Sequence, residues 1–410
     1  MTQGHVLTIP AAASLPANAP RSARAALRLL QRLRHGTLEV QLPAGAGTLR
    51  FGSGATPHAS LQLHDWSVCA RTLRAGDIGF AESHMDGAWS SPDLAALLEL
   101  FLLNRNELEA MIYGSRWAGL LYRLRHLLRR NSRRQARKNI HAHYDLGNDF
   151  YRLWLDATMS YSSAWFEGDL ARPLDAAQRA KMRRALVQCG IGPGQRLLEI
   201  GCGWGSLAAM AAQDFGARVT GLTLSQEQLS WGREAMQRAG LGASVELRLQ
   251  DWRELDGGPF DAICSVEMFE AVGREYWDAY FRALHRLLRP QGRACIQTIV
   301  IRDDLFARYL HSTDFIQQYI FPGGLLPSPS AFRERARAAG LEIVDELDFG
   351  PDYAETLRRW RERFTAAEPQ VRALGFDARF LRMWTFYLAY CEAAFARRNT
   401  SVVQFTLRRP

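Results

Sequence analysis

From residue 194 onward the chain alternates short apolar segments with amphipathic ones, and this alternation limits the fold more than any other feature of the sequence. The apolar segments have the length of strands, and the amphipathic ones have the length of helices. Because parallel neighbouring strands need a crossover connection, the repeated units predict a doubly wound α/β sheet with ligands at the carboxyl ends of its strands. The predicted strands are 196–201, 218–224, 244–249, 260–266 and 292–301, and the predicted helices are 206–214, 225–239 and 274–288.

A glycine-rich turn follows the first of these strands, in the sequence EIGCGWG at residues 199–205. Gly201, Gly203 and Gly205 permit a tight turn and let a ligand lie against bare backbone. A dinucleotide site has the spacing GxGxxG, whose third glycine allows close helix–strand packing around a pyrophosphate. The spacing here is GxGxG with Glu199 two positions before it, which is typical of an S-adenosylmethionine site. A nicotinamide dinucleotide and a turn without a ligand are the less favoured interpretations.

Polar residues after the next two predicted strands complete this candidate cofactor site. The second strand lacks the terminal acid that usually holds ribose hydroxyls, and neutral side chains stand near its end instead. After the third strand, a carboxylate followed by an indole is suited to the amino group and the ring of adenine. The candidates are Thr223, Leu224, Ser225 and Gln228 after the second strand, and Asp251 and Trp252 after the third.

The positive charge of the chain is concentrated in its first third. The net charge is +9, and residues 1–140 hold 18 basic against 9 acidic side chains, so they carry the whole excess. A basic run between residues 123 and 138 can bind nucleic acid or an anionic lipid surface, or it can be a solvated helix face. Its members are Arg123, Arg125, Arg129, Arg130, Arg133, Arg134, Arg137 and Lys138.

Length and composition indicate a globular protein of two or three domains, with 410 residues of which 47% are hydrophobic. The six cysteines form no CxxC pair, so neither a metal site nor a disulfide framework is expected, and a cytoplasmic setting fits best. No apolar run reaches the ~20 residues that span a bilayer, so we expect any membrane contact to be peripheral, on the inner face.

The expected organisation is a mobile tail at 1–22, an N-terminal α+β domain at 23–115, a basic linker at 116–140 and the α/β domain at 141–410. Within the N-terminal domain, strands are predicted at 37–40, 48–51 and 60–64, and an apolar helix at 94–103.

Further segments accompany the glycine-rich turn and carry a family resemblance. They are GDIGFAESHMDG at 76–87, HYDLGNDFY at 143–151, GLTLS at 221–225, IFPGG at 320–324 with LPS at 326–328, and FYL at 386–388 ahead of Cys391. Together they cover nearly the whole chain and resemble the cyclopropane-fatty-acyl-phospholipid synthase family. The resemblance implies a Rossmann-like methyltransferase domain with a smaller N-terminal domain. It also implies methyl transfer from S-adenosylmethionine to a cis double bond of a phospholipid acyl chain, with Tyr161 and Ser162 beside the cofactor.

The implied chemistry explains some of the residue types. An alkene is a poor nucleophile and its methylation leaves a carbocation, so the site must exclude water and can use aromatic faces to stabilise charge. A base must then remove one proton. Loss of a proton from the new methyl group closes a cyclopropane ring, whereas loss from a neighbouring carbon gives a methyl- or methylene-branched chain. The aromatic candidates, each of which can equally be a core residue, are Trp165, Phe166, Tyr319, Phe321 and Tyr387.

The resemblance also shows where this chain departs from the family. The family's synthases hold a bicarbonate ion as the base in a cage of Cys, Glu, His and Tyr. The matching positions here are Ser163, Glu270, Gln297 and Tyr387, so two of the four are changed. A family glycine has in addition become Glu267, at the end of the fourth predicted strand. Loss of a histidine donor and gain of a carboxylate both weaken an anion site, so the sequence argues against a firmly bound bicarbonate.

Glu267 is therefore a candidate for a built-in base. The alternatives are that it binds a ribose or a cation, or that it points into solvent. The pattern is similar to a divergent subgroup that makes methylated, methylene-branched or furan-type fatty acids. Cys391 matches a cysteine proposed as catalytic in the family, although a structural role is the more favoured interpretation.

Three functions follow from these patterns. The first is a lipid C-methyltransferase that works on an anionic phospholipid surface, with a homodimer as a further expectation. The second is an RNA or small-molecule methyltransferase with a basic arm, which the absence of a recognised RNA-binding motif disfavours. The third is a lipid-binding relic without activity, which the intact cofactor turn disfavours.

Overall fold

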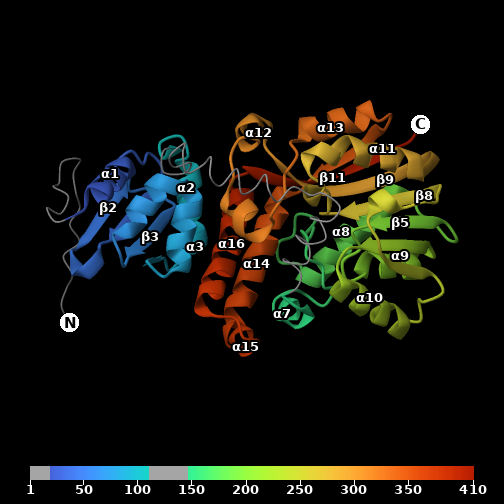
Figure 1. The fold of residues 1–410 in the computed structure, drawn as a ribbon, viewed down its shortest axis with the longest axis horizontal. Helices are drawn as coiled ribbons and strands as arrows, with labels where there is room; N and C mark the ends of the chain where they lie inside the picture. Colours follow the sequence, from blue (N-terminus) through green and yellow to red (C-terminus); the bar gives the residue numbers. More distant parts are fainter. Residues whose placement is uncertain (1–18, 110–145) are drawn as a thin grey trace. The chain divides into compact units, whose positions relative to one another are not determined.

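The computed structural model describes residues 19–109 and 146–410, which form two compact units (Figure 1). The first unit combines the N-terminal residues with 311–320 and 368–397, and the second contains the remaining described residues. The basic run at 123–138, the expected linker at 116–140 and residues 143–145 of the HYDLGNDFY motif lie outside the described residues.

The first unit is built on a four-stranded sheet with the strand order β2-β1-β3-β4. Strand β1 (Thr37–Gln41) is antiparallel to β2 (Thr48–Gly52) and parallel to β3 (His58–Leu63), which pairs with the short β4 (Trp89–Ser90). Alternate residues of these strands are buried, as expected for a sheet with one covered face. The three predicted strands of the N-terminal domain are therefore found at their predicted positions.

Helices cover this sheet and extend the first unit. They are α1 (Arg21–Leu30), α2 (Ser67–Met85) and α3 (Leu94–Leu103), with a 3-10 turn, η1 (Pro43–Gly45). The carboxylate of Asp93 caps α3 by accepting from the backbone N–H of Ala96 at 3.0 Å. Helix α2 contains a break at Gly76, whose φ of 62° is open to glycine and strained for other residues. The last members come from far along the chain: η5 (Ile316–Ile320), α15 (Glu368–Ala373) and α16 (Ala378–Ala396), of which α16 packs on α2 and α3.

The second unit contains a seven-stranded sheet with the order β10-β11-β9-β8-β5-β6-β7. Its members are β5 (Arg196–Ile200), β6 (Arg218–Thr223), β7 (Val245–Leu249), β8 (Phe260–Val266), β9 (Leu288–Ile301), β10 (Glu342–Asp348) and β11 (Thr400–Arg408). Strands β5 to β9 run parallel to one another, whereas β11 is antiparallel to both β9 and β10. The predicted doubly wound α/β sheet is confirmed.

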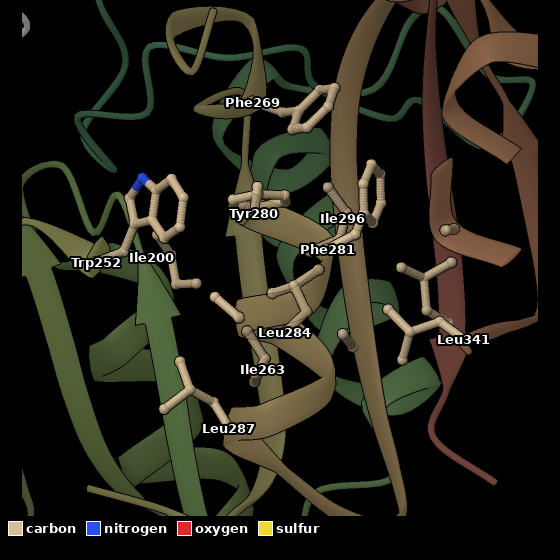
Figure 2. Packing of buried hydrophobic residues seen from close by; sticks show 14 of the residues in the cluster. Ile200, Trp252, Ile263, Phe269, Tyr280, Phe281, Leu284, Leu287, Ile296 and Leu341 are labelled. Carbon is tan, nitrogen blue, oxygen red and sulfur yellow. The ribbon is translucent and has the colours of Figure 1, made fainter. Parts of the chain in front are cut away.

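Helices cover both faces of this sheet, and each face has its own apolar core. On one face, α11 (Trp277–Leu287) and α13 (Pro329–Ala338) pack on the central strands. Figure 2 shows Phe281, Leu284 and Leu287 of α11 lying against Ile263 and Ile296 of the sheet. On the other face, the cover consists of α8 (Leu174–Cys189), α9 (Ser206–Phe215) and α10 (Gln226–Arg238).

The remaining helices and 3-10 turns of the second unit precede its strands or connect them. They are α7 (Asn148–Arg152), η2 (Trp252–Glu254), η3 (Phe269–Ala271), η4 (Arg274–Tyr276), α12 (Asp303–Tyr309) and α14 (Gly350–Ala366). Among the residues that the structure describes, no helix combines the length and the apolar character needed to cross a membrane.

The division into units differs from the expected domain boundaries. Residues 311–320 and 368–397 were expected in the α/β domain at 141–410, but they pack with the N-terminal unit. The reason is that the apolar sides of α2, α3 and α16 bury one another, so three-dimensional packing joins segments that the sequence separates by more than 200 residues.

Candidate active site

The glycine-rich turn after β5 has the geometry that its sequence predicts. Gly201, Gly203 and Gly205 have φ angles of 86°, 50° and 92°, a region that other residues avoid. A Cβ at Gly203 would meet no atom within 4 Å, so open space lies over this turn. Glu199 is buried beside it, and its Oε2 finds no hydrogen-bond partner among the described residues. Burial raises the pKa of this carboxyl well above its usual range. A bare backbone beside an unsatisfied acidic group fits a ligand that brings donors or positive charge.

The residues predicted after β6 lie together in one turn. The hydroxyl of Thr223 donates to Oε1 of Gln228 at 2.9 Å, and the hydroxyl of Ser225 caps α10 by accepting from the N–H of Gln228 at 3.2 Å. Leu224 connects them. The turn therefore offers neutral polar groups at the edge where the sequence predicted the cofactor ribose.

Asp251 and Trp252 follow β7 and also lie at the carboxyl ends of the strands. The Asp251 carboxylate is paired with Arg253, whose Nε and Nη2 lie 2.9 and 2.6 Å from its two oxygens. Trp252 is almost fully buried and packs edge-on against Tyr280, with ring centroids 5.3 Å apart. Their contact with adenine stays a prediction.

Glu267 lies directly after β8 and accepts hydrogen bonds from three other parts of the chain: the loop at Ser163, β9 and α14. Its Oε1 accepts from the backbone N–H of Ser163 at 2.8 Å and from Nε2 of Gln297 at 2.7 Å. Its Oε2 accepts from the Tyr353 hydroxyl of α14 at 2.6 Å. Its backbone φ is 49°, in the left-handed region that glycine prefers. A glutamate here costs about 1–2 kcal/mol in backbone strain relative to glycine, and the chain nevertheless places a carboxylate at this point.

A further set of hydrogen bonds fixes the amide of Gln297. Its Oε1 accepts from Nε2 of Gln404 at 3.0 Å, and Oε1 of Gln404 accepts from Arg184 at 2.8 Å. Since the oxygen of Gln297 already has a donor, its nitrogen is the atom that faces Glu267. Arg184 is paired in turn with Asp345. The glutamine at the family's histidine position is thus oriented as a donor to the carboxylate.

Glu270 lies one turn further on, in η3, and differs from Glu267 in its surroundings. Its Oε1 accepts from the backbone N–H of Ile299, while Oε2 finds no partner among the described residues. Burial, and then repulsion from Glu267, raise the pKa of Glu270 to about 8. Burial also raises the pKa of Glu267, but Lys181 and the Tyr353, Ser163 and Gln297 donors oppose that rise. The pKa of both neighbouring carboxyls is thus raised, but a cation and three donors oppose the rise only at Glu267, and such a difference in surroundings is common in acid–base sites.

Aromatic rings gather beside these polar groups. The Tyr161 ring lies 5.5 Å from the rings of Tyr151, Trp154 and Trp360, and 6.4 Å from that of Phe321. The indole N–H of Trp204, within the glycine-rich turn, donates to the Asn148 side chain of α7 at 2.7 Å. The HYDLGNDFY and IFPGG motifs therefore meet the cofactor turn through an aromatic cluster, which suits chemistry that must exclude water.

The structure brings together four predicted site residues, Ser163, Glu267, Glu270 and Gln297. The tyrosine hydroxyl on Glu267 comes from Tyr353, which the sequence analysis did not select. The sequence marks Tyr353 only by its position near the start of α14, the helix that follows β10.

Tyr387 and Cys391 lie on α16, in the first unit. The ring of Tyr387 packs on Trp384, with centroids 5.2 Å apart. Burial, together with the nearby Asp314, raises the pKa of the Cys391 thiol. A thiol that stays protonated is a poor nucleophile, which favours the structural interpretation of Cys391. The part played by Tyr387 in catalysis stays a prediction.

The strand order, the glycine-rich turn at the first strand and the polar edge after the second define a Rossmann-like methyltransferase. Residues 131–405 match the profile of the mycolic acid cyclopropane synthetase family, so the chain belongs to this family.

Relatives and solved structures agree with this assignment. The chain is 42% identical to the tuberculostearic acid methyltransferase UfaA1 of Mycobacterium tuberculosis, over 98% of this chain and 95% of that one. It is 36% identical to the cyclopropane-fatty-acyl-phospholipid synthase of Escherichia coli K12, over 87% and 89% of the two chains. The crystal structure of mycolic acid cyclopropane synthase CmaA1 complexed with SAH and CTAB superposes with a TM-score of 0.63 and 36% identity, covering 66% of this chain and 98% of that one.

Proposed function

We propose that this chain transfers the methyl group of S-adenosylmethionine to a double bond of an unsaturated fatty acyl chain in a membrane phospholipid, with Glu267 as the base. Family membership and the activities in the names of both curated relatives support the reaction class. The observation that carries the role of the base is the position of Glu267: a strained backbone, a partly buried side chain and three donors on its carboxylate.

The residues around the glycine-rich turn fit the cofactor. Gly203 offers open space over the turn, and Glu199 has an unsatisfied oxygen beside it. When bound, S-adenosylmethionine supplies an electrophilic methyl group. Gly203→Val places a branched side chain in that space, so we expect at least a tenfold loss of affinity for S-adenosylhomocysteine by calorimetry, about 1.4 kcal/mol or more. Gly190→Val is the matched control, because Gly190 has a similar positive φ and open surroundings at the end of α8.

Glu267 supplies in one residue what a bound bicarbonate supplies to the family's synthases. Its carboxylate has the charge and the two acceptor oxygens of that anion, and the donors of Ser163, Gln297 and Tyr353 already bind it. A second anion beside it would meet repulsion and few remaining donors. Glu267 then takes the proton that the methylated acyl chain must lose. Whether that proton leaves the new methyl group or a neighbouring carbon determines whether a cyclopropane or a branched chain forms.

The test is Glu267→Gln, which keeps the size of the side chain but cannot accept the proton. Methyl transfer to phospholipid should fall by about 10²–10⁴-fold, while S-adenosylhomocysteine affinity changes little. Wild-type turnover should also be unaffected when bicarbonate is stripped from the buffer. A fully active Glu267→Gln variant, or a wild-type enzyme that stops without bicarbonate, would refute the role of Glu267. Mass spectrometry and NMR of the lipid product would identify the proton that is lost.

We further propose that the first unit contacts an anionic phospholipid surface. The first 38 residues contain five arginines and no acidic residue. On α1, Ala23, Leu27 and Leu30 are buried, whereas Arg21 and Arg28 are exposed on one face, and Arg32 follows. Each basic residue near such a surface contributes roughly 1 kcal/mol.

Changing Arg21, Arg28 and Arg32 to Gln should weaken binding to vesicles that contain phosphatidylglycerol and flatten its salt dependence. A control variant changes Arg196, Arg218 and Arg238, exposed arginines of the second unit of which the first two lie at the amino ends of β5 and β6. Equal loss in both variants, or none in the first, would refute a specific role for α1.

A further inference from the structure

One of the chain's two lysines is enclosed in the second unit. The sequence has 51 lysines and arginines, of which only Lys138 and Lys181 are lysines, and Lys181 on α8 is 1% exposed. Arginine is always charged and carries a wide planar group, whereas lysine is a compact point charge. In a chain that uses arginine almost everywhere, a lysine at a fully buried position indicates a need for that compact charge.

The ammonium group of Lys181 reaches the segment that holds Glu267. Its Nζ donates to Oγ of Ser162 at 2.5 Å, and the next residue, Ser163, donates its backbone N–H to Glu267. The backbone carbonyl of Lys181 accepts a hydrogen bond from Nε2 of Gln404 at 3.2 Å. The same Nε2 donates to Oε1 of Gln297, whose own Nε2 donates to Oε1 of Glu267. Lys181 is therefore connected to Glu267 through both its head group and its backbone.

The charges around this lysine are acidic. Burial lowers the pKa of Lys181 to about 8. The opposing effect is attraction by the carboxyl groups of Glu267, Asp156 and Glu199. The titratable groups that face Glu267 are Lys181 from α8, the Tyr353 hydroxyl from α14 and the carboxyl of Glu270 from η3.

Among the described residues, Lys181 is the cation that acts on Glu267, because the neighbouring Arg184 is paired with Asp345 and Gln404. A buried carboxylate without a compensating charge takes up a proton instead of remaining ionised.

We propose that Lys181 is a positioning residue that keeps Glu267 in its ionised, proton-accepting form. This inference rests on the proposed function, in which Glu267 is the base. It predicts that removal of the lysine charge does not remove the base but changes the pH at which the base works. The acid limb of the pH–activity profile reports the ionisation of Glu267 and should move to higher pH.

The experiment compares Lys181→Met with Gln178→Met. Gln178 lies on the same helix, is equally buried and donates to the Ser162 carbonyl at 2.8 Å, but it has no charge. We expect the acid limb of Lys181→Met to rise by at least one pH unit, with much of the activity recovered at high pH. Gln178→Met should lower activity at all pH values without moving the limb. An unmoved limb in Lys181→Met, or the same shift in both variants, would overturn the proposal.

A second measurement tests the proposal even if Lys181→Met lowers the stability of the fold. In a double-mutant cycle by thermal unfolding, Lys181→Met should cost less stability in the Glu267→Gln background than in the wild type, since the lysine then has one charged partner fewer. Additive effects would count against the proposal. Full activity of Glu267→Gln alone would instead refute the role of Glu267 as the base, so the two failures are distinguishable.

Discussion

Each unit of this protein encloses an acidic cluster with a tyrosine, and the two clusters differ in what accompanies the carboxyls. In the second unit, Glu267 has Lys181 nearby and three hydrogen-bond donors. In the first unit, Asp77 lies at the break in α2, and its Oδ2 accepts from the Tyr390 hydroxyl at 3.0 Å and more weakly from the N–H of Phe315. Burial and the nearby Asp314 raise the pKa of Asp77 to about 7, while burial raises that of Asp314 to about 6.

The comparison teaches that burial alone does not determine what a carboxyl does. Burial raises the pKa of each of these groups. With a lysine and a full set of donors, the carboxylate can stay charged and act as a base. With a tyrosine and a few backbone N–H groups, it retains a proton near neutral pH and can only connect segments, here α2, α16 and residues 314–315. The predictions below test this difference.

The largest effect is expected from Glu267→Gly. This change removes the base and leaves the donors of Ser163, Gln297 and Tyr353 around an empty position. Activity should fall by about 10²–10⁴-fold, and added formate or bicarbonate should restore part of it by occupying those donors. The strained backbone at this residue would also relax.

Glu267→Gln is the control for this rescue, because its amide still fills the position and should exclude the added anion. Rescue of both variants, or of neither, would show that the donors do not form an anion site. The donors around Glu267 would then not distinguish the second unit from the first.

Tyr353→Phe should have an intermediate effect. It removes one hydrogen bond to a charged group, a contribution of about 1.5–3 kcal/mol. The loss raises the pKa of Glu267, so activity at neutral pH should fall and the acid limb of the profile should move to higher pH. Tyr387→Phe should leave the limb in place. The opposite pattern would favour the tyrosine suggested by the family resemblance.

The smallest effect is expected from Asp77→Asn, measured as thermal stability against pH. The pKa of Asp77 is about 7 in the folded chain and about 3.8 in the unfolded chain. The folded state therefore binds the proton of Asp77 more tightly than the unfolded state does. The contribution of Asp77 to the free energy of unfolding is complete below about pH 4 and is lost as the pH rises through about 7. The variant should resemble the wild type below about pH 4 and become relatively more stable as the pH rises toward 8.

Asp86→Asn is a control of opposite sign in the same unit. Hydrogen bonding to Arg71 lowers the pKa of Asp86, so its contribution is present at neutral pH and is lost as the solution becomes acidic. Both groups of this ion pair are partly exposed, so the effect should stay below about 1 kcal/mol. If both variants changed stability in the same direction with pH, the first-unit cluster would not be a proton-retaining site.

Local patterns in the sequence predicted the sheet of the second unit well. Strand β8 was predicted with its observed bounds, because a central parallel strand is apolar on both faces and ends at a change to polar residues. The turn at Gly203 and the group formed by Ser163, Glu267 and Gln297 were also predicted, since strand ends and motif positions define them.

Other contacts could not be predicted because they depend on packing between distant segments. Tyr353 and Glu267 are 86 residues apart, and nothing near Tyr353 indicates its partner. Lys181 lies on α8 among several arginines, and only the fold shows that its side chain is enclosed. For the same reason the sequence did not indicate that α16 packs on α2 and α3.

The attachment of Glu267 to the backbone has a further consequence for turnover. A dissolved anion that acts as base occupies its site according to its concentration and can carry the proton away when it leaves. A carboxylate fixed at φ 49° is present in every molecule at a high effective concentration, whatever the carbonate supply. It cannot depart with its proton, however, so it must be discharged before the next catalytic cycle. Proton export through the groups around Glu267 thus becomes a step of its own, and a solvent isotope effect on steady-state turnover would reveal it.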